Sequence, residues 1–150
     1  MGMEIERKFL VEEPLPSWEG GEKIVQGMRA LTPNVRVRVR GGRGYLTIKG
    51  PPQGITRPEW EYEIPLLEAV EMLRTLCTLT VEKTRYEVEY EGHVWEVDVF
   101  EGANAGLVVA EIELQAEDEP FERPSWVRAE VTDDPRYLNT NLAKVPFTTW

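Results

Sequence analysis

Residues 35–40 read Val35-Arg36-Val37-Arg38-Val39-Arg40, a strict alternation of valine and arginine. Successive side chains of a β-strand point to opposite faces, so this pattern predicts a strand with three valines on one face and three arginines on the other. Arginines on the same face lie about 7 Å apart and repel one another unless anions or carboxylates offset them. The stretch therefore predicts a charged sheet face that meets negatively charged groups.

The same alternation extends along most of the chain. Residues 59–64 give the mirror image, because Glu59, Glu61 and Glu63 share one strand face. We expect eight strands, near residues 3–11, 24–30, 35–41, 44–50, 58–64, 80–91, 93–101 and 107–116. Consecutive, mostly antiparallel strands favour a closed barrel, because closure removes exposed strand edges.

Two helices are expected beside these strands. Leu66 to Cys77 carries apolar residues at helical spacing, and Pro135 to Lys144 follows Asp134, a candidate N-cap. A chain of 150 residues has the natural size of one domain, here 1–150. We therefore expect a mainly β (α+β) fold, an eight-stranded antiparallel closed barrel that forms a charged tunnel with a few flanking helices.

The charge of the chain is unevenly distributed. The 27 acidic and 17 basic residues give a net charge of −10, but residues 29–58 alone carry +7, which leaves −17 on the remainder. An acidic outer surface argues against bulk nucleic acid and anionic membranes as partners. The ordinary alternative is a sheet with one solvated face, but such faces mix neutral polar residues with their charges. A tunnel in which basic strands face acidic strands accounts for both parts of the chain.

The cysteine and histidine content limits the chemistry. Cys77 and His93 are the only residues of their types, which disfavours an intrachain disulfide, a cysteine metal cluster and a Ser-His-Asp triad. We find neither an apolar leader nor a run of about 18 apolar residues, so we expect a cytoplasmic protein with no membrane partner. Any bound metal would take oxygen ligands, which suits Mg²⁺ or Mn²⁺.

A tunnel with these two kinds of side chain has the components of phosphoryl transfer. Arginine and lysine at fixed spacing bind several phosphates of a polyanion, and clustered carboxylates bind a divalent cation that bridges protein and phosphate oxygens. Catalysis of phosphoryl transfer is mostly positioning and charge stabilisation. The sequence has no Walker A motif, so any phosphate site is built from side chains.

Seven charged motifs follow one another in an informative order. The first is Glu4-Ile5-Glu6-Arg7-Lys8, and the others lie at residues 35–38, 45–50, 59–65, 82–86, 95–100 and 110–114. Together they resemble the ExExK, RxR, TxK, ExExE, KxR and later acidic strands of the CYTH family, the triphosphate tunnel metalloenzymes. Residues 130–139 resemble the ending of its short bacterial members. Members often carry Gln-Gly-Tyr where this chain has Gln26-Gly27-Met28, so a tyrosine hydroxyl is missing there.

The resemblance covers nearly the whole chain and implies both a fold and an activity. It implies an eight-stranded antiparallel barrel around a tunnel, and cleavage of triphosphate substrates with Mg²⁺ or Mn²⁺. The chain looks most like the short bacterial inorganic triphosphatases. We therefore expect an enzyme, a divalent-metal-dependent triphosphatase that converts inorganic tripolyphosphate, its small-molecule partner, to pyrophosphate and phosphate.

The resemblance also implies roles for individual residues. The residues expected to bind the triphosphate are Lys8, Arg36, Arg38, Lys49, Arg57, Lys83, Arg85 and Arg136. The residues expected at the metal site are Glu4, Glu6, Glu61, Glu63, Asp98, Glu111 and Glu113, with Glu4, Glu6, Glu111 and Glu113 the preferred ligands. The catalytic candidates are Lys83, Glu111 and Glu113.

Several alternatives stay open on the sequence. A class IV adenylate cyclase and a thiamine or nucleoside triphosphatase would use the same tunnel. A non-catalytic polyphosphate-binding module would keep the basic residues but would not need the acidic ones, which are present here. A plain structural barrel explains the three inward arginines least well. A homodimer is a further hypothesis about assembly.

Overall fold

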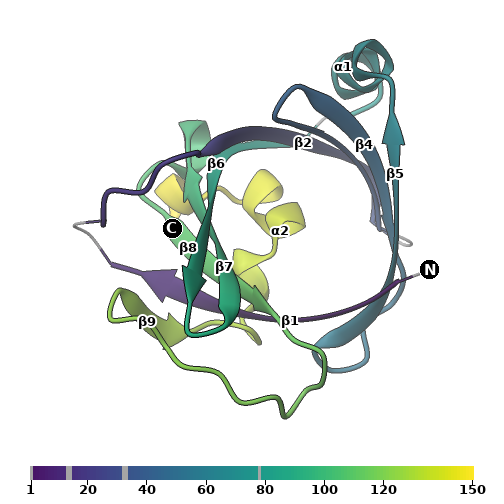
Figure 1. Cartoon of the computed structure of the whole chain (residues 1–150). Coiled ribbons are helices and arrows are strands. Elements are labelled where there is room, and N and C mark those ends of the chain that lie inside the picture. The colour runs from purple at the N-terminus through teal and green to yellow at the C-terminus, as the bar shows by residue number, and fades with distance from the viewer. Residues whose placement is uncertain (1, 13–14, 32–33, 78) are drawn as a thin grey trace.

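Eight strands close into an antiparallel barrel (Figure 1). In the computed structural model, which describes residues 2–12, 15–31, 34–77 and 79–150, their order around the barrel is β1-β5-β4-β3-β2-β6-β7-β8, with β8 pairing again with β1. The strands are β1 (Gly2–Val11), β2 (Glu22–Leu31), β3 (Asn34–Arg40), β4 (Arg43–Lys49), β5 (Thr56–Ile64), β6 (Leu79–Tyr90), β7 (His93–Phe100) and β8 (Val108–Glu113). The mainly β fold and the closed eight-stranded barrel predicted from the sequence are confirmed. The side chain of Met28 lies outside the described part of the chain.

A ninth strand, β9 (Val127–Glu130), was not predicted. It pairs with β1 at Phe9 and Val11, beyond the point where the pairing of β1 with β5 ends at Ile5. The four residues are too few to show a clear alternation, which explains why the sequence does not reveal them. β9 lies outside the closed ring, beside β1 in Figure 1.

Two tight turns fix the register of the hairpins. Gly41 and Gly42 both have positive φ, at 56° and 80°, in the turn between β3 and β4. Glu91 and Gly92, at 47° and 82°, do the same between β6 and β7. Two consecutive residues with positive φ match the twist of antiparallel strands, so the alternation of β3 continues into β4 without a slip.

The apolar face of the sheet points outward and is covered in part by the rest of the chain. Trp95 is fully buried at its centre and packs against Phe9 and Trp126, with ring centroids 5.5 and 5.9 Å apart. Helix α1 (Leu66–Thr75) covers another part through Ala69, and a Cβ at Gly44 would lie only 2.6 Å from the Ala69 Cβ. With the outside packed in this way, the charged face lines the interior.

The prediction of one continuous helix over residues 135–144 is wrong. The segment forms a short 3₁₀ helix, η2 (Pro135–Tyr137), and then α2 (Asn139–Lys144), because Leu138 between them is extended with ψ 136°. The predicted cap is present, since the Asp134 carboxylate accepts a hydrogen bond from the Arg136 N–H. Helix α1 ends at Thr75, two residues before the predicted end.

The C-terminal segment, residues 135–150, packs into one end of the barrel, where α2 lies inside the ring of strands in Figure 1. Leu142 is fully buried against Val81, Phe100 and Val109, which stand at inward-facing positions of β6, β7 and β8. Asn104, in the 3₁₀ helix η1 (Gly102–Asn104), holds the segment there: its side chain donates to the Leu142 carbonyl and accepts from the Phe147 N–H. A last 3₁₀ helix is η3 (Phe147–Thr149).

Within the described ranges, no helix has both the length and the apolar character needed to cross a membrane.

Candidate active site

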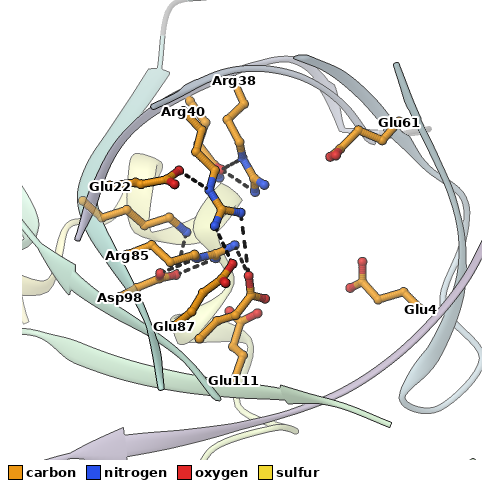
Figure 2. A network of polar contacts seen from close by, with 12 residues as sticks. Glu4, Glu22, Arg38, Arg40, Glu61, Arg85, Glu87, Asp98 and Glu111 are labelled. Atoms are coloured by element: carbon orange, nitrogen blue, oxygen red, sulfur yellow. Dashed lines mark hydrogen bonds and ion pairs between the residues drawn. The ribbon is translucent and has the colours of Figure 1, made fainter. Parts of the chain in front are cut away.

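A cavity of ≈ 380 Å³ occupies the barrel interior, and most side chains that line it are charged. In Figure 2, Arg38 and Arg40 face Glu4 and Glu61 across this space. Of the predicted site residues, the cavity brings together Glu4, Glu6, Lys8, Arg36, Arg38, Lys49, Arg57, Glu61, Arg85, Glu111 and Glu113.

Carboxylates of β1 and β8 form one wall. Glu6 lies opposite Glu113 in the strand register, and Lys8 lies opposite Glu111, with the Lys8 Nζ 3.5 Å from the Glu111 carboxylate. Burial raises the pKa of Glu6 well above its ordinary value, and the Glu111 charge adds to this rise. Burial alone would raise the pKa of Glu111, but the charges of Lys8, Arg85 and Lys83 together hold it well below the ordinary value. The wall thus holds an ionised carboxylate beside one that resists ionisation.

Lys49 links the β1 wall to the neighbouring strands. Its ammonium lies 2.8 Å from a Glu4 carboxylate oxygen and 3.7 Å from Glu59. Burial and the Glu4 charge raise the pKa of Glu59 to about 7. Burial would raise the pKa of Glu4, but Lys49 reverses this effect and lowers it.

Lys83, Asp98 and Arg85 form a buried ionic cluster on the neighbouring strands β6 and β7. The Lys83 ammonium lies 2.8 Å from Asp98, and the Arg85 guanidinium donates to both Asp98 oxygens at 2.7 and 2.9 Å. Lys83 and Asp98 are 0% and 1% exposed and do not line the cavity, whereas Arg85 does. Burial lowers the pKa of Lys83 to about 8, although Asp98 opposes this effect.

Three inward arginines are held by neutral oxygens. Arg36 donates to the Asn34 side chain at 3.1 Å, and Arg57 donates twice to the Gly50 carbonyl. Arg38 donates through Nε and Nη2 to the Gln26 side-chain oxygen, at 3.1 and 3.0 Å.

Arg40 lies at one mouth of the cavity. It pairs with Glu22 at 3.0 Å, Glu87 at 2.8 Å and Glu96 at 3.8 Å, which joins β3 to β2, β6 and β7 (Figure 2). A second cavity, lined in part by Tyr45, shares Arg38, Arg40 and Glu61 with the first, so the two are adjacent at this mouth.

Two predicted site residues lie away from the interior cavity. Glu63 is on the rim, where its side chain is 55% exposed and pairs with Arg43. Arg136 is 60% exposed and pairs with Asp134. Neither lines the cavity.

The cavity also contains residues that the predicted set left out. Glu59 and Glu96 share the strand parity of Glu61 and Asp98, so the alternation contained the signal that places them inside. Asn34 stands two residues before Arg36 and faces the same way. Residues 138–140 also line the cavity, and no local pattern in the sequence predicts this placement.

The acidic wall suits a hard divalent cation. Oxygen ligands are those that Mg²⁺ and Mn²⁺ prefer. Repulsion from the carboxylates of Glu111 and Glu4 adds to the effect of burial in raising the pKa of Glu6. A bound cation would relieve that repulsion. Among the described residues no three acidic, histidine or cysteine side chains converge into a preformed metal site. A cation bound here would therefore complete its shell with water and substrate oxygens.

Comparison with known proteins places the chain in a family. It is 51% identical over 151 residues to the inorganic triphosphatase of Acetivibrio thermocellus. The alignment covers 98% of this chain and 97% of that protein. It is 35% identical over 150 residues to the inorganic triphosphatase of Nitrosomonas europaea, across 93% of this chain and 96% of that protein. The crystal structure of an inorganic triphosphatase, 34% identical, superposes with a TM-score of 0.69 over 95% of each chain. The family model of the CYTH domain matches residues 2–143. The chain therefore belongs to the CYTH family.

Proposed function

We propose that this protein is an inorganic triphosphatase that uses Mg²⁺ or Mn²⁺ to convert tripolyphosphate to pyrophosphate and phosphate. The observation that carries the proposal is the interior cavity, in which arginines and lysines stand opposite a carboxylate wall. The 51% identical relative that is an inorganic triphosphatase supports the choice of substrate. We take residues 1–150 as one functional unit.

The basic side chains bind the phosphates. Arg36, Arg38 and Arg57 offer forked donors, whereas Lys8 and Lys49 act as point charges. Arg85 contributes from the Asp98 cluster, and Lys83 acts from β6 by holding Asp98. Arg136 lies outside the cavity, so its positive charge would attract the substrate only while the substrate approaches the barrel.

The carboxylates of β1 and β8 would hold the metal, with Glu4, Glu6, Glu111 and Glu113 as the ligands we propose first, directly or through a bound water. Mg²⁺ or Mn²⁺ would supply Lewis-acid stabilisation of the charge that develops on the phosphates. Glu61 approaches from the other side of the cavity and is a further candidate. Asp98 and Glu63 are less suited, because neither of them lines the cavity.

Glu113 is the residue we propose to take the proton of the attacking water. Burial and the charges of Glu4 and Glu96 raise the pKa of Glu113, which makes it a better base than an ordinary carboxylate. It lines the cavity, whereas Lys83 does not. The water oxygen would bond to a terminal phosphorus as the anhydride bond breaks and pyrophosphate leaves.

The test is phosphate release from tripolyphosphate, ATP and thiamine triphosphate, with and without Mg²⁺ or Mn²⁺. We expect metal-dependent release that is fastest from tripolyphosphate. Lys8→Ala should raise KM for tripolyphosphate roughly tenfold to a hundredfold, the loss of one charge-assisted hydrogen bond. Glu111→Gln should raise the metal concentration needed for half-maximal rate.

Glu68→Gln on the outer helix α1 is the control, since it removes one carboxylate far from the cavity lining. Absence of release from every substrate would overturn the proposal. Cyclic AMP and pyrophosphate from ATP would favour a cyclase, and binding without turnover would favour a polyphosphate-binding module.

Assembly and location complete the proposal. We propose a homodimer, supported by exposed apolar side chains on the outside of β5 and α1, Tyr62 at 56%, Leu67 at 82% and Val70 at 42%. Light scattering of the purified protein tests this part independently of activity. We also propose that the protein works in the cytoplasm, which fits a chain with one cysteine and hence no intrachain disulfide.

A further inference from the structure

The cations around the cavity fall into two groups. Lys8, Lys49, Lys83, Arg40 and Arg85 each have a carboxylate within 4.0 Å. Arg36, Arg38 and Arg57 have none within that distance among the residues that the structure describes. The second group thus keeps more of its positive charge available to a ligand.

Gln26 makes the clearest case. It is fully buried on β2, opposite Arg38 in the strand register, and does not line the cavity. Its single side-chain oxygen accepts both Nε and Nη2 of Arg38. The reversed amide would set an NH₂ group against guanidinium donors, so the oxygen must point to Arg38. Two hydrogen bonds from one guanidinium to one buried oxygen fix the direction of the arginine.

Asn34 holds Arg36 by a single hydrogen bond, two residues nearer the start of β3. The Arg36 Nε donates to the Asn34 side-chain oxygen, and Asn34 is buried. Both arginines are therefore oriented by an amide oxygen, which accepts hydrogen bonds but carries no net charge.

The choice of amide or carboxylate matters for a polyanion. A carboxylate in the same position would orient the guanidinium equally well and cancel its charge. Arg85 illustrates that alternative, since Asp98 holds it by two charge-assisted hydrogen bonds. An amide keeps the orientation and leaves the charge for phosphate oxygens.

We propose that Gln26 is a positioning residue that holds Arg38 in place without neutralising it, and that Asn34 does the same for Arg36. This inference rests on the proposed triphosphatase function. Gln26 and Asn34 would then contribute to substrate affinity indirectly, through Arg38 and Arg36. These two arginines would differ from the interior cations that are paired with carboxylates.

The unpaired half of the Gln26 amide makes the inference testable. Its Nε2 group is buried without a hydrogen-bond partner among the described residues, which is unfavourable for the fold. Gln26→Glu removes that donor and gives Arg38 an ion-pair partner of the same shape. The variant should therefore keep or gain thermal stability while it loses affinity for tripolyphosphate, a combination that a purely structural role of Gln26 does not produce.

The experiment measures KM and kcat for tripolyphosphate with Mg²⁺, direct binding of tripolyphosphate by calorimetry, and the thermal midpoint. For Gln26→Glu we expect KM and Kd to rise roughly tenfold to a hundredfold, the range for one charge-assisted hydrogen bond, with a smaller change in kcat. Gln115→Glu, the same substitution on the exposed outer surface, is the matched control for net charge and should leave both constants unchanged.

Asn34→Asp provides a second measurement at the other arginine and should raise KM in the same direction. If Gln26→Glu does not fold, this variant alone decides the outcome. Folded variants with the KM of the unmodified protein would overturn the inference while the triphosphatase proposal stands. Failure of the unmodified protein to bind or hydrolyse tripolyphosphate would instead overturn the proposed function, and the inference with it.

Discussion

Asp98 shows how a single buried carboxylate organises several cations. It is 1% exposed, lies 2.8 Å from the Lys83 ammonium and accepts two hydrogen bonds from Arg85. Burial would raise the pKa of Asp98, but the charges of Lys83 and Arg85 reverse this and lower it. The ionised form of the aspartate is therefore favoured in the folded protein, where it neutralises Lys83 and, together with Glu96, Arg85.

We expect Asp98→Asn to destabilise the fold strongly. Removal of one partner from a buried ionic cluster leaves uncompensated charge and typically costs about 3–5 kcal/mol. Urea unfolding measures the loss. Glu63→Gln, which breaks the exposed pair with Arg43, is the matched control and should cost less than about 1 kcal/mol. Equal unfolding midpoints for the two variants would contradict this account.

The alternation of residues predicts which side chains face inward but not how deep each lies. Arg36 and Arg38 reach the cavity as their parity predicts, yet Lys83 is covered and Glu63 stands on the rim. An alternation with a period of two shows on which face of the sheet a side chain lies. It does not show how far along the barrel axis that side chain lies. This position depends on the stagger between strands, which is set by long-range pairing. The roles of these residues remain predictions.

At the level of elements, an ion pair adds to the backbone pairing between β1 and β9. The Arg7 Nε donates to the Glu130 carboxylate at 2.8 Å, and both side chains are partly exposed. The hydrogen bond from Arg7 lowers the pKa of Glu130 below its ordinary value, although partial burial opposes this effect. A lowered pKa means that the ionised form of Glu130 is favoured by folding.

This pair gives a pH-dependent contribution to stability with a definite sign. It is fully present above the pKa that Glu130 has in the unfolded chain, and it is lost as pH falls through the lowered folded value. Arg7→Gln should therefore reduce the free energy of unfolding at neutral pH, by about 1 kcal/mol or less, and the difference from the unmodified protein should shrink in acid. Denaturant unfolding at several pH values measures it. A difference that grows as pH falls would be inconsistent with the pair.

The prediction of elements fails where tertiary contacts override local signals. Asp134 and Pro135 do start a helical turn, as their cap pattern predicts, but Leu138 is extended and lines the cavity. Pairing with β1 likewise defines β9, whose four residues have no distinct pattern of their own. Local sequence signals report how an element starts, whereas its continuation here depends on partners distant in the chain.

For the whole molecule, the charged interior predicts that ligands stabilise the fold. Carboxylates repel one another on one wall, and arginines repel one another on the other, so Mg²⁺ together with tripolyphosphate should relieve both. A ligand at a hundred times its Kd adds about 2.7 kcal/mol to the free energy of unfolding.

We therefore expect the thermal midpoint to rise with both additions together, by more than with either alone. Potassium chloride at equal ionic strength controls for screening. An equal rise with the salt alone would show that general screening, and not a bound ligand, is responsible.

The closure of the barrel through β1 has a consequence for biosynthesis. β1 precedes every strand with which it pairs, and those partners, β5, β8 and β9, lie far along the chain. Pairings so distant in sequence make folding slow compared with that of proteins built from local contacts. During translation the acidic wall remains incomplete until β8 has emerged from the ribosome and can pair with β1. A nascent chain thus carries the basic arginine hairpin, β3 and β4, for some time before the carboxylates of β8 that will face it exist.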